Sequence, residues 1–328
     1  MRPMLGRLMT TLQLTRVSIT FGAVSDLWFT IVLVWSFSKW TAVPAVWWAQ
    51  PTLFQAVLIL VAAVVVAVGL FGCGAAINDV LDARRDAAFS PERPIPAGRI
   101  RPGQAVVVAV TALMISVVAA AVLGPWSVWL TLFAASLVLF YNAAARFVPA
   151  VGIVTLGIIH AVHMLIPYPE MPIVLPVWWS MSHAMMLAIG VHMLESKRPR
   201  LTRRAVLGIV VGWMFWSVML LLLAMDRGIG VWPDSVPLHG LLYPAGAMII
   251  FMVFARWKIS TAPDWPAAAE KLKRYGAMWH AVYAASWLLA LGLPWPAACF
   301  GVLAVTGLVV MTVWRELLGL SGRPVEYR

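Results

Sequence analysis

The sequence predicts an all-α membrane protein, a polytopic bundle of nine to ten transmembrane helices. Hydrophobic residues make up 62% of the 328 positions and charged residues only 11%. A soluble protein of this length could not bury so much apolar surface. The apolar residues also gather into segments of about 20 residues, the length that a helix needs to cross a bilayer. The solvent of this chain is therefore expected to be lipid.

Ten apolar segments follow one another along the chain, and Pro or Gly marks many of the gaps between them. The segments are 17–38, 53–77, 103–123, 126–145, 148–166, 173–193, 205–225, 238–256, 276–293 and 296–318. The last of these predicts an extra C-terminal helix over 296–318. Together they predict a single transmembrane domain over residues 1–328.

The basic residues predict which side of the bundle faces the cytoplasm. With a cytoplasmic N-terminus, the cytoplasmic loops are 78–102, 195–204 and 256–275. All but two of the 24 Lys and Arg residues, Lys39 and Arg227, then lie on that side. This is the positive-inside pattern, and it predicts an integral protein of a bacterial inner membrane. The net charge of +11 then reflects orientation and contact with anionic lipid, and no nucleic-acid partner is expected.

A cluster of carboxylates follows the second apolar segment, in the sequence N-D-V-L-D-A-R-R-D over 78–86. Asp79, Asp82 and Asp86 stand at i, i+3 and i+7, so a helix places all three on one face. Like charges grouped in this way repel unless a cation lies between them. Hard oxygen ligands suit Mg²⁺, which usually shares its coordination shell with phosphate oxygens. The alternative is a solvated helix end whose acids balance nearby Arg residues.

The loop after these carboxylates carries donors suited to phosphate. It reads S-P-E-R-P-I-P-A-G-R-I over 90–100, and its Pro and Gly residues set the direction of the chain. Arg93 and Arg99 supply forked donors that match phosphate oxygens. Carboxylates, a metal and Arg together make a diphosphate site. There the metal and Arg stabilise the charge that grows on a departing diphosphate.

These residues resemble a known family. The run G-C-G-A-A-I over 72–77, followed by N-D-x-x-D-x-x-x-D and R-P-I-P-A-G-R-I, is similar to the first Asp-rich motif of the UbiA superfamily of intramembrane prenyltransferases. The resemblance implies about nine helices around a central cavity that opens to lipid. It also implies Mg²⁺-dependent transfer of an isoprenoid chain from its diphosphate to an aromatic or other acceptor.

The resemblance implies roles for particular residues. Asn78, Asp79, Asp82 and Asp86 would bind Mg²⁺ and the diphosphate, with the three aspartates as the catalytic residues and Arg93 beside them. The family often carries Y-x-x-x-K-R after the fourth span. Here Tyr141 and Arg146 fit that pattern as substrate-binding residues, while Ala145 replaces the Lys.

The second Asp-rich motif of the family is missing. The corresponding stretch, 182–201, contains no Asp, and Glu195 is its only acid. In one interpretation Glu195, His192 and the basic residues substitute for the motif. Glu195 is then a metal ligand, while Lys197 and Arg198 bind phosphate oxygens and do part of the electrostatic work of the second metal. In the other, the second Mg²⁺ is lost, and with it efficient ionisation of an allylic diphosphate. One Mg²⁺ site is therefore expected and the second is left open.

Two functions follow from these observations. The preferred one is a Mg²⁺-dependent prenyltransferase that acts on an isoprenoid diphosphate and an aromatic, quinone-precursor or tetrapyrrole acceptor. The alternative is a catalytically degenerate subunit of a larger membrane complex that binds lipid, quinone or pigment.

Ionisable residues inside the apolar segments raise a separate question. His160 and His163, at i and i+3, either face a haem, a pigment or a metal, or form hydrogen bonds between helices, and hydrogen bonding is favoured. Asp26 in the first segment either pairs with a polar group across the cavity or marks a break in the helix.

Overall fold

The computed structural model describes residues 20–37, 46–91, 93–226, 231–233 and 236–320. Within these residues the chain forms ten α-helices and two short 3-10 helices, and no strand is found among them. The all-α prediction is therefore confirmed. Lys39, Arg227 and the three Arg residues before position 17, all used in predicting the orientation, lie outside the described residues.

Each predicted apolar segment corresponds to one helix. The α-helices are α2 Phe21–Phe37, α3 Leu53–Phe89, α4 Pro102–Leu123, α5 Pro125–Ala143, α6 Pro149–Leu165, α7 Leu175–Leu194, α8 Arg203–Asp226, α9 Leu242–Ser260, α10 Trp265–Ala290 and α11 Pro294–Leu320. The 3-10 helices are η2 Ala145–Phe147 and η3 Leu238–Leu241. Helix α11 lies where the sequence predicts the extra C-terminal helix.

Two helices extend beyond their predicted bounds into polar sequence. Helix α3 continues past Ile77 to Phe89, so the aspartates lie on a helix and only the remainder of 78–102 is loop. Helix α10 begins at Trp265, where the Asp264 side chain accepts a hydrogen bond of 2.7 Å from the Ala267 amide. Such an N-cap, with Pro in the first turn, starts a helix independently of apolar composition. The predicted bounds followed hydropathy alone and therefore missed both extensions.

Several helices are suited to a membrane. Within the part of the chain that the structure describes, five helical segments are long and apolar enough to cross a bilayer, namely α3, α4, α5, α8 and Leu238–Ser260. Helices α2, α6 and the first part of α11 are apolar but shorter. Large side chains of α8, including Leu207, Val211 and Phe215, are exposed. A helix that is apolar on its outer face is expected to contact lipid. The chain is an integral membrane protein.

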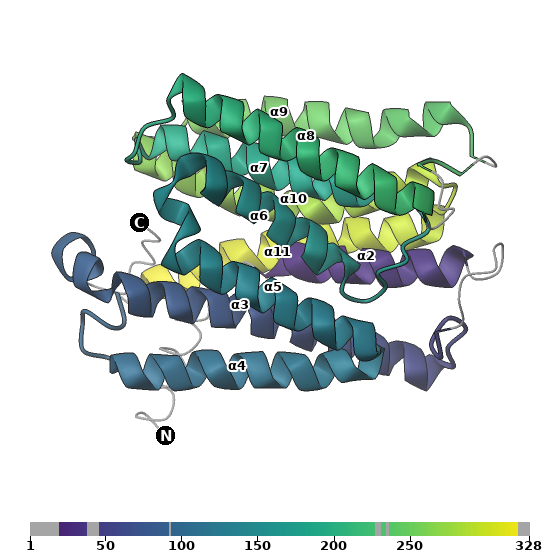
Figure 1. Cartoon of the computed structure of the whole chain (residues 1–328), viewed down its shortest axis with the longest axis horizontal. Helices are drawn as coiled ribbons and strands as arrows, with labels where there is room; N and C mark the ends of the chain where they lie inside the picture. The colour runs from purple at the N-terminus through teal and green to yellow at the C-terminus, as the bar shows by residue number, and fades with distance from the viewer. Residues whose placement is uncertain (1–19, 38–45, 92, 227–230, 234–235, 321–328) are drawn as a thin grey trace.

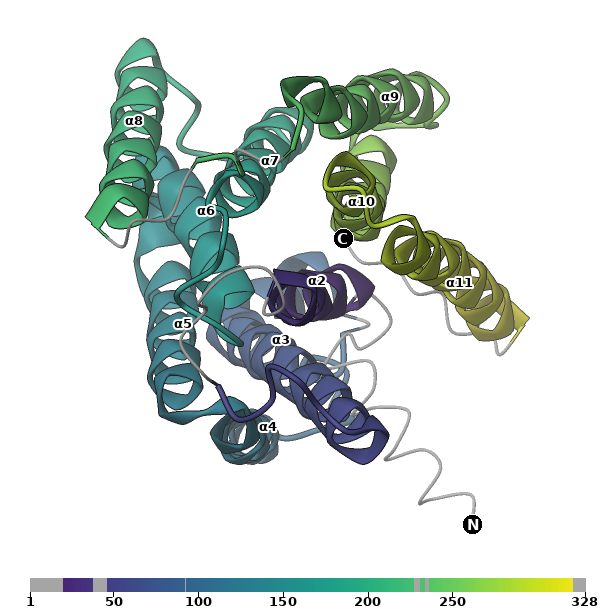
Figure 2. The same ribbon diagram turned by 90° about the vertical axis from the view of Figure 1, so that its right-hand side faces the viewer.

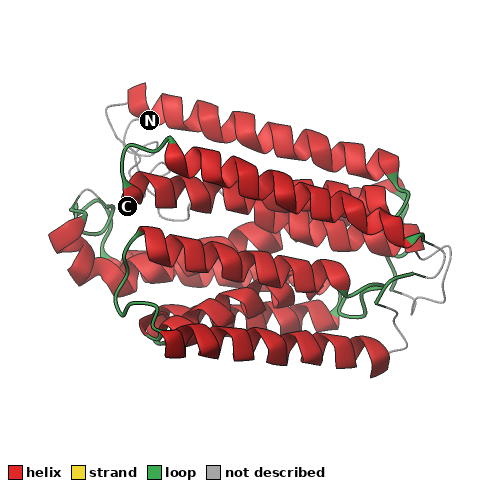
Figure 3. Cartoon of the chain, turned by 90° about the horizontal axis from the view of Figure 1, so that it is seen from above, coloured by secondary structure: helices red, strands yellow, loops and turns green. Residues whose placement is uncertain are grey.

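The helices run side by side along the long axis of the molecule, and their connections gather at its two ends (Figure 1, Figure 3). Helix α2 lies in the middle of the bundle and packs against α3, α6 and α10 (Figure 2). Its side chains Leu27, Ile31 and Leu33 are fully buried. Helix α8 packs on α6, α4 on α3 and α5, and α11 on α10.

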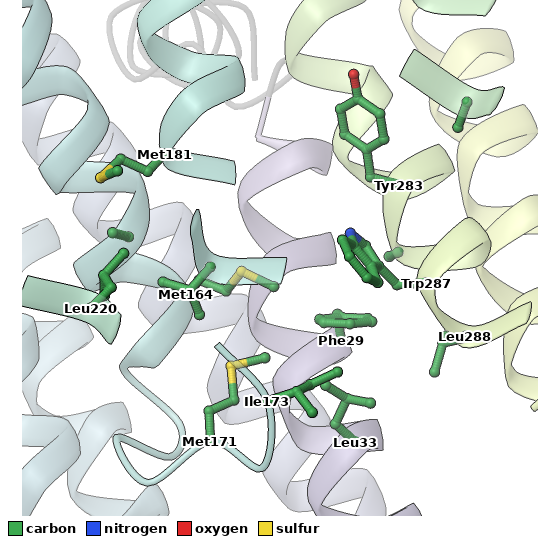
Figure 4. Close-up of a cluster of buried hydrophobic side chains, with 14 of the residues drawn as sticks. Phe29, Leu33, Met164, Met171, Ile173, Met181, Leu220, Tyr283, Trp287 and Leu288 are labelled. Carbon is green, nitrogen blue, oxygen red and sulfur yellow. The ribbon is translucent and has the colours of Figure 1, made fainter. Parts of the chain in front are cut away.

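The core around α2 is large and rich in Met and aromatic residues. Phe29 of α2 faces Trp287 of α10, and Met164 of α6 and Met171 complete this part of the cluster (Figure 4). Helices α2 and α10 approach closely at Gly22, where a Cβ atom would overlap the carbonyl group of Ala277. Thr30 Oγ1 donates a hydrogen bond of 2.7 Å to the Met164 carbonyl and so joins α2 to α6. The inner faces of α2, α6 and α10 are thereby held in register.

Candidate functional site

The three aspartates of α3 form one buried face, as their spacing predicts. Asp79, Asp82 and Asp86 are 4%, 8% and 5% exposed, whereas Arg84 and Arg85 between them are exposed to solvent. Buried carboxylates need compensating charge or hydrogen bonds. The structure therefore does not support a solvated helix end, because the acids turn inward and the adjacent arginines turn outward.

Arg146 provides the compensation for Asp82. Its Nη2 and Nη1 atoms donate to the two oxygens of Asp82 at 2.7 and 2.8 Å, in a bidentate fork. Nη1 also donates to Oδ1 of Asn78 at 3.2 Å. Arg146 lies on η2, in the break between α5 and α6, and Pro149 starts α6 directly afterwards. This break turns the side chain of Arg146 toward α3.

Arg93 compensates the other two carboxylates. Its Nη1 lies 2.6 Å from Oδ2 of Asp86 and 3.7 Å from Oδ1 of Asp79. The loop that carries Arg93 is closed by backbone hydrogen bonds from the Arg99 and Ile100 amides to the Pro94 carbonyl. Gly98 has a φ of 69°, which favours glycine. Arg99 itself is exposed. The compact loop thus holds one of the two predicted arginines over the aspartate face.

A second charged group lies in the stretch that lacks the second Asp-rich motif. Glu195, at the end of α7, forms ion pairs with Lys197, at 2.9 Å, and with Lys273 of α10. Burial raises the pKa of Glu195, but the two ammonium groups outweigh that effect and hold the pKa below its ordinary value. Two cations face one carboxylate, so the group carries a net positive charge. Arg198 is exposed.

Lys273 was not predicted from the sequence. It lies 78 positions after Glu195, on a helix whose cytoplasmic end was expected to be a loop. No local motif marks it, because only the packing of α7 against α10 brings the two side chains together.

Tyr141 lies near the C-terminal end of α5, five residues before Arg146, and its side chain is half-buried. The predicted site residues from α3, α5, η2 and α7 lie at one end of the bundle.

The residues of this site fit a magnesium ion and a diphosphate. Carboxylate and amide oxygens from Asp79, Asp82, Asp86 and Asn78 are the donor type that Mg²⁺ prefers. The forked donors of Arg93 and Arg146 match phosphate oxygens as well as carboxylates. The three carboxylates exceed the two guanidinium groups by one negative charge, which favours a cation on this face.

Known proteins resemble this chain in sequence and in fold. Residues 38–275 match the UbiA prenyltransferase family. A digeranylgeranylglyceryl phosphate synthase of Methanosarcina barkeri (strain Fusaro / DSM 804) is 33% identical over 105 residues, which are 32% of this chain and 35% of that protein. The match thus spans about a third of that relative's length.

One solved structure extends the likeness to most of the bundle. A structure of a digeranylgeranylglyceryl phosphate synthase superposes with a TM-score of 0.56 at 16% identity, over 88% of this chain and 99% of the other. A UbiA homologue from Archaeoglobus fulgidus, solved with GPP and Mg²⁺ bound, has a TM-score of 0.42 at 15% identity, over 92% and 99% of the two chains. The first of these confirms the expected fold, and the family match covers most of the sequence. The chain belongs to the UbiA prenyltransferase family.

Proposed function

We propose that this protein is a Mg²⁺-dependent intramembrane prenyltransferase, which moves an isoprenoid chain from its diphosphate to an acceptor at the cytoplasmic rim of a bacterial inner membrane. The observation that carries the proposal is the buried carboxylate face of α3, held between Arg93 and Arg146. Buried ion pairs are seldom more stable than apolar packing of the same size, so their presence in a membrane protein favours a functional role.

The residues divide into two roles. Mg²⁺ would be held by Asp79, Asp82, Asp86 and Asn78. The guanidinium groups of Arg93 and Arg146 would then donate hydrogen bonds to phosphate oxygens in place of the carboxylates. When bound, Mg²⁺ would neutralise charge that develops on the departing diphosphate. The arginines keep the diphosphate oriented, so that its bond to the isoprenoid points into the apolar interior.

The group around Glu195 would take the place of the second Asp-rich motif. Lys197 and Lys273 carry the positive charge that a second metal would otherwise bring to the diphosphate. Glu195 fixes both ammonium groups through its ion pairs, and Arg198 stands next in sequence. In this proposal Glu195 orients cations and does not bind a metal, which departs from its sequence-based assignment.

The acceptor classes follow from the family and from its relatives. The proposed acceptors are aromatic compounds, quinone precursors and tetrapyrroles. The M. barkeri relative is named for a glyceryl phosphate product, so a glyceryl phosphate acceptor joins them. Its phosphate would suit the net positive charge around Glu195.

The direct test is prenyl transfer in liposomes that contain the purified full chain. Labelled allylic diphosphates of several lengths, Mg²⁺ and each acceptor class are supplied, and release of diphosphate and labelled product are measured. Asp82→Ala should lower turnover about 10²- to 10³-fold, the effect of losing one charge-stabilising group. Asp226→Ala, at the exposed end of α8, is the matched control and should leave turnover unchanged.

Lysine variants test the replacement of the second metal. Lys273→Ala should lower turnover at least about tenfold and raise the Mg²⁺ concentration needed for half-maximal rate. Lys271→Ala is the control, because the Lys271 ammonium donates a hydrogen bond to the carbonyl of Thr261, directly after the end of α9. Absence of turnover with every diphosphate, together with stable co-purifying proteins, would overturn the enzyme proposal and favour the alternative of a complex subunit.

A further inference from the structure

Three metal-binding side chains meet inside the bundle, on helices other than the one that carries the aspartate face. Asp26 of α2, His160 of α6 and His280 of α10 each offer one ligand atom, and these atoms all lie within 4.8 Å of one another. We propose that they bind a divalent transition-metal ion of the Zn²⁺ or Fe²⁺ type. This site is separate from the proposed Mg²⁺ site and does not depend on it.

The spacing of the ligand atoms fits a shared ion. Oδ1 of Asp26 lies 3.0 Å from Nδ1 of His280, and Oδ2 lies 4.0 Å from Nδ1 of His160. Two atoms that each lie about 2.1 Å from one metal, at tetrahedral or octahedral angles, are about 3.0 to 3.4 Å apart. Asp26 and His280 already have this separation, whereas the His160 nitrogen has to move closer to Asp26 to share the ion.

Unpartnered buried atoms provide an independent reason for a ligand. Asp26 and His280 are 4% and 3% exposed. Oδ2 of Asp26 and Nε2 of His280 have no hydrogen-bond partner among the residues that the structure describes. A buried carboxylate with one unsatisfied oxygen is costly within a membrane protein. The Asp26–His280 hydrogen bond leaves that oxygen unsatisfied, whereas a divalent cation between Asp26 and His160 compensates it.

The donor types select the kind of metal. Two imidazoles and one carboxylate suit Zn²⁺ or Fe²⁺, whereas Mg²⁺ prefers oxygen ligands alone. The aspartate face of α3 consists only of oxygen donors. The two sites should therefore take different metals even when both metals are present.

The surroundings leave room for a further ligand on the metal. His160 keeps 39% of its side-chain surface exposed, although it lies well inside α6. In addition, Asp26 and His280 help to line a small pocket together with Ser180, Phe29, Tyr283 and Trp287, the last three of which are labelled in Figure 4. A site with three protein ligands and an open position is typical of a reactive metal, which binds water or a substrate there.

Metal analysis of the full chain tests this inference. The protein is purified in detergent through a tag without histidine, and its metals are counted by mass spectrometry. Wild type should carry about one equivalent of Zn or Fe per chain, and His160→Ala should lower that content about tenfold or more. His239→Ala, which removes an exposed histidine of η3, should retain the metal. Asp26→Asn and His280→Ala should behave as His160→Ala does.

A Co²⁺ titration of the wild-type protein tests the metal site without relying on variants, which could fail to fold. After chelation, Co²⁺ should restore about one equivalent and produce visible absorption bands of a low-coordinate site. Wild type that holds less than about 0.1 equivalent and shows no Co²⁺ spectrum would overturn the inference, as would a folded His160→Ala protein with full metal content. Asp82→Ala should lower prenyl transfer about 10²- to 10³-fold yet keep this metal, so failure of either proposal can be recognised without the other.

Discussion

Removal of Arg146 should lower the free energy of unfolding, because this residue compensates the buried carboxylate of Asp82. Arg146 makes a bidentate pair with Asp82 at 2.7 and 2.8 Å, and the two side chains are 15% and 11% exposed. Arg146→Ala therefore leaves the Asp82 carboxylate with little water and without its counter-charge. It also removes the hydrogen bond to Asn78.

The magnitude follows from burial. Loss of one partner from a fully buried ion pair costs about 3 to 5 kcal/mol of unfolding free energy. Residual exposure of both side chains lowers the expected cost to about 2 to 4 kcal/mol, because water screens part of the stranded charge. Asp82→Ala on its own removes that charge. The double variant Arg146→Ala and Asp82→Ala should therefore cost less than the sum of the two single variants, with a coupling of about 2 kcal/mol.

The measurement is reversible unfolding of the full chain by SDS in mixed micelles, without added metal. Arg204→Ala, at an exposed position at the start of α8, is the control and should change stability by less than about 0.5 kcal/mol. An Arg146→Ala protein as stable as the Arg204→Ala protein would refute the reasoning. So would a coupling energy below about 0.5 kcal/mol, which would show that the pair contributes nothing specific.

Two further predictions concern the acid after α7 and the contact between α2 and α10. Burial raises the pKa of Glu195, but its lysine partners outweigh that effect and hold the pKa below the ordinary 4.5. The stabilisation by Glu195 is therefore present above pH 4.5 and is lost as pH falls through the lowered pKa. The difference in Tm between wild type and Glu195→Gln should be constant from about pH 8 to pH 6 and shrink under more acidic conditions; a difference that grows on acidification would contradict this sign. Gly22→Ala should destabilise by about 2 to 4 kcal/mol in SDS unfolding, because the new methyl group meets the Ala277 backbone. Gly246→Ala, in open space on α9, should be neutral or slightly stabilising, and equal effects of the two substitutions would show that α2 and α10 are not closely packed.

Much of the fold could be predicted from hydropathy because lipid imposes a long apolar run on every spanning helix. The predicted segments differ from the helices mainly where polar sequence continues a helix, as in α3 up to Phe89 and in α10 from Trp265. Hydropathy does not detect such extensions, since they depend on capping by Asp264 and on ion pairs formed after folding.

The candidate site was only partly predictable. The common face of Asp79, Asp82 and Asp86 follows from helical periodicity, and Arg93 lies near enough in sequence to be expected beside it. Resemblance to a family indicated Arg146 as a phosphate ligand, but its fork onto Asp82 required the break at η2. Lys273 belongs to no local motif, and only helix packing revealed it beside Glu195.

The sequence by itself determined that this protein lies in a membrane and that three aspartates share one face of a helix. Both properties arise from local regularities, namely apolar run length and the 3.6-residue repeat. The tertiary structure decided which charges meet. Asp26 and His280 are 254 positions apart, and their contact depends on the close packing of α2 against α10. Pairings of this kind depend on the geometry of the whole bundle, because each partner satisfies a buried charge that no neighbour in sequence can reach.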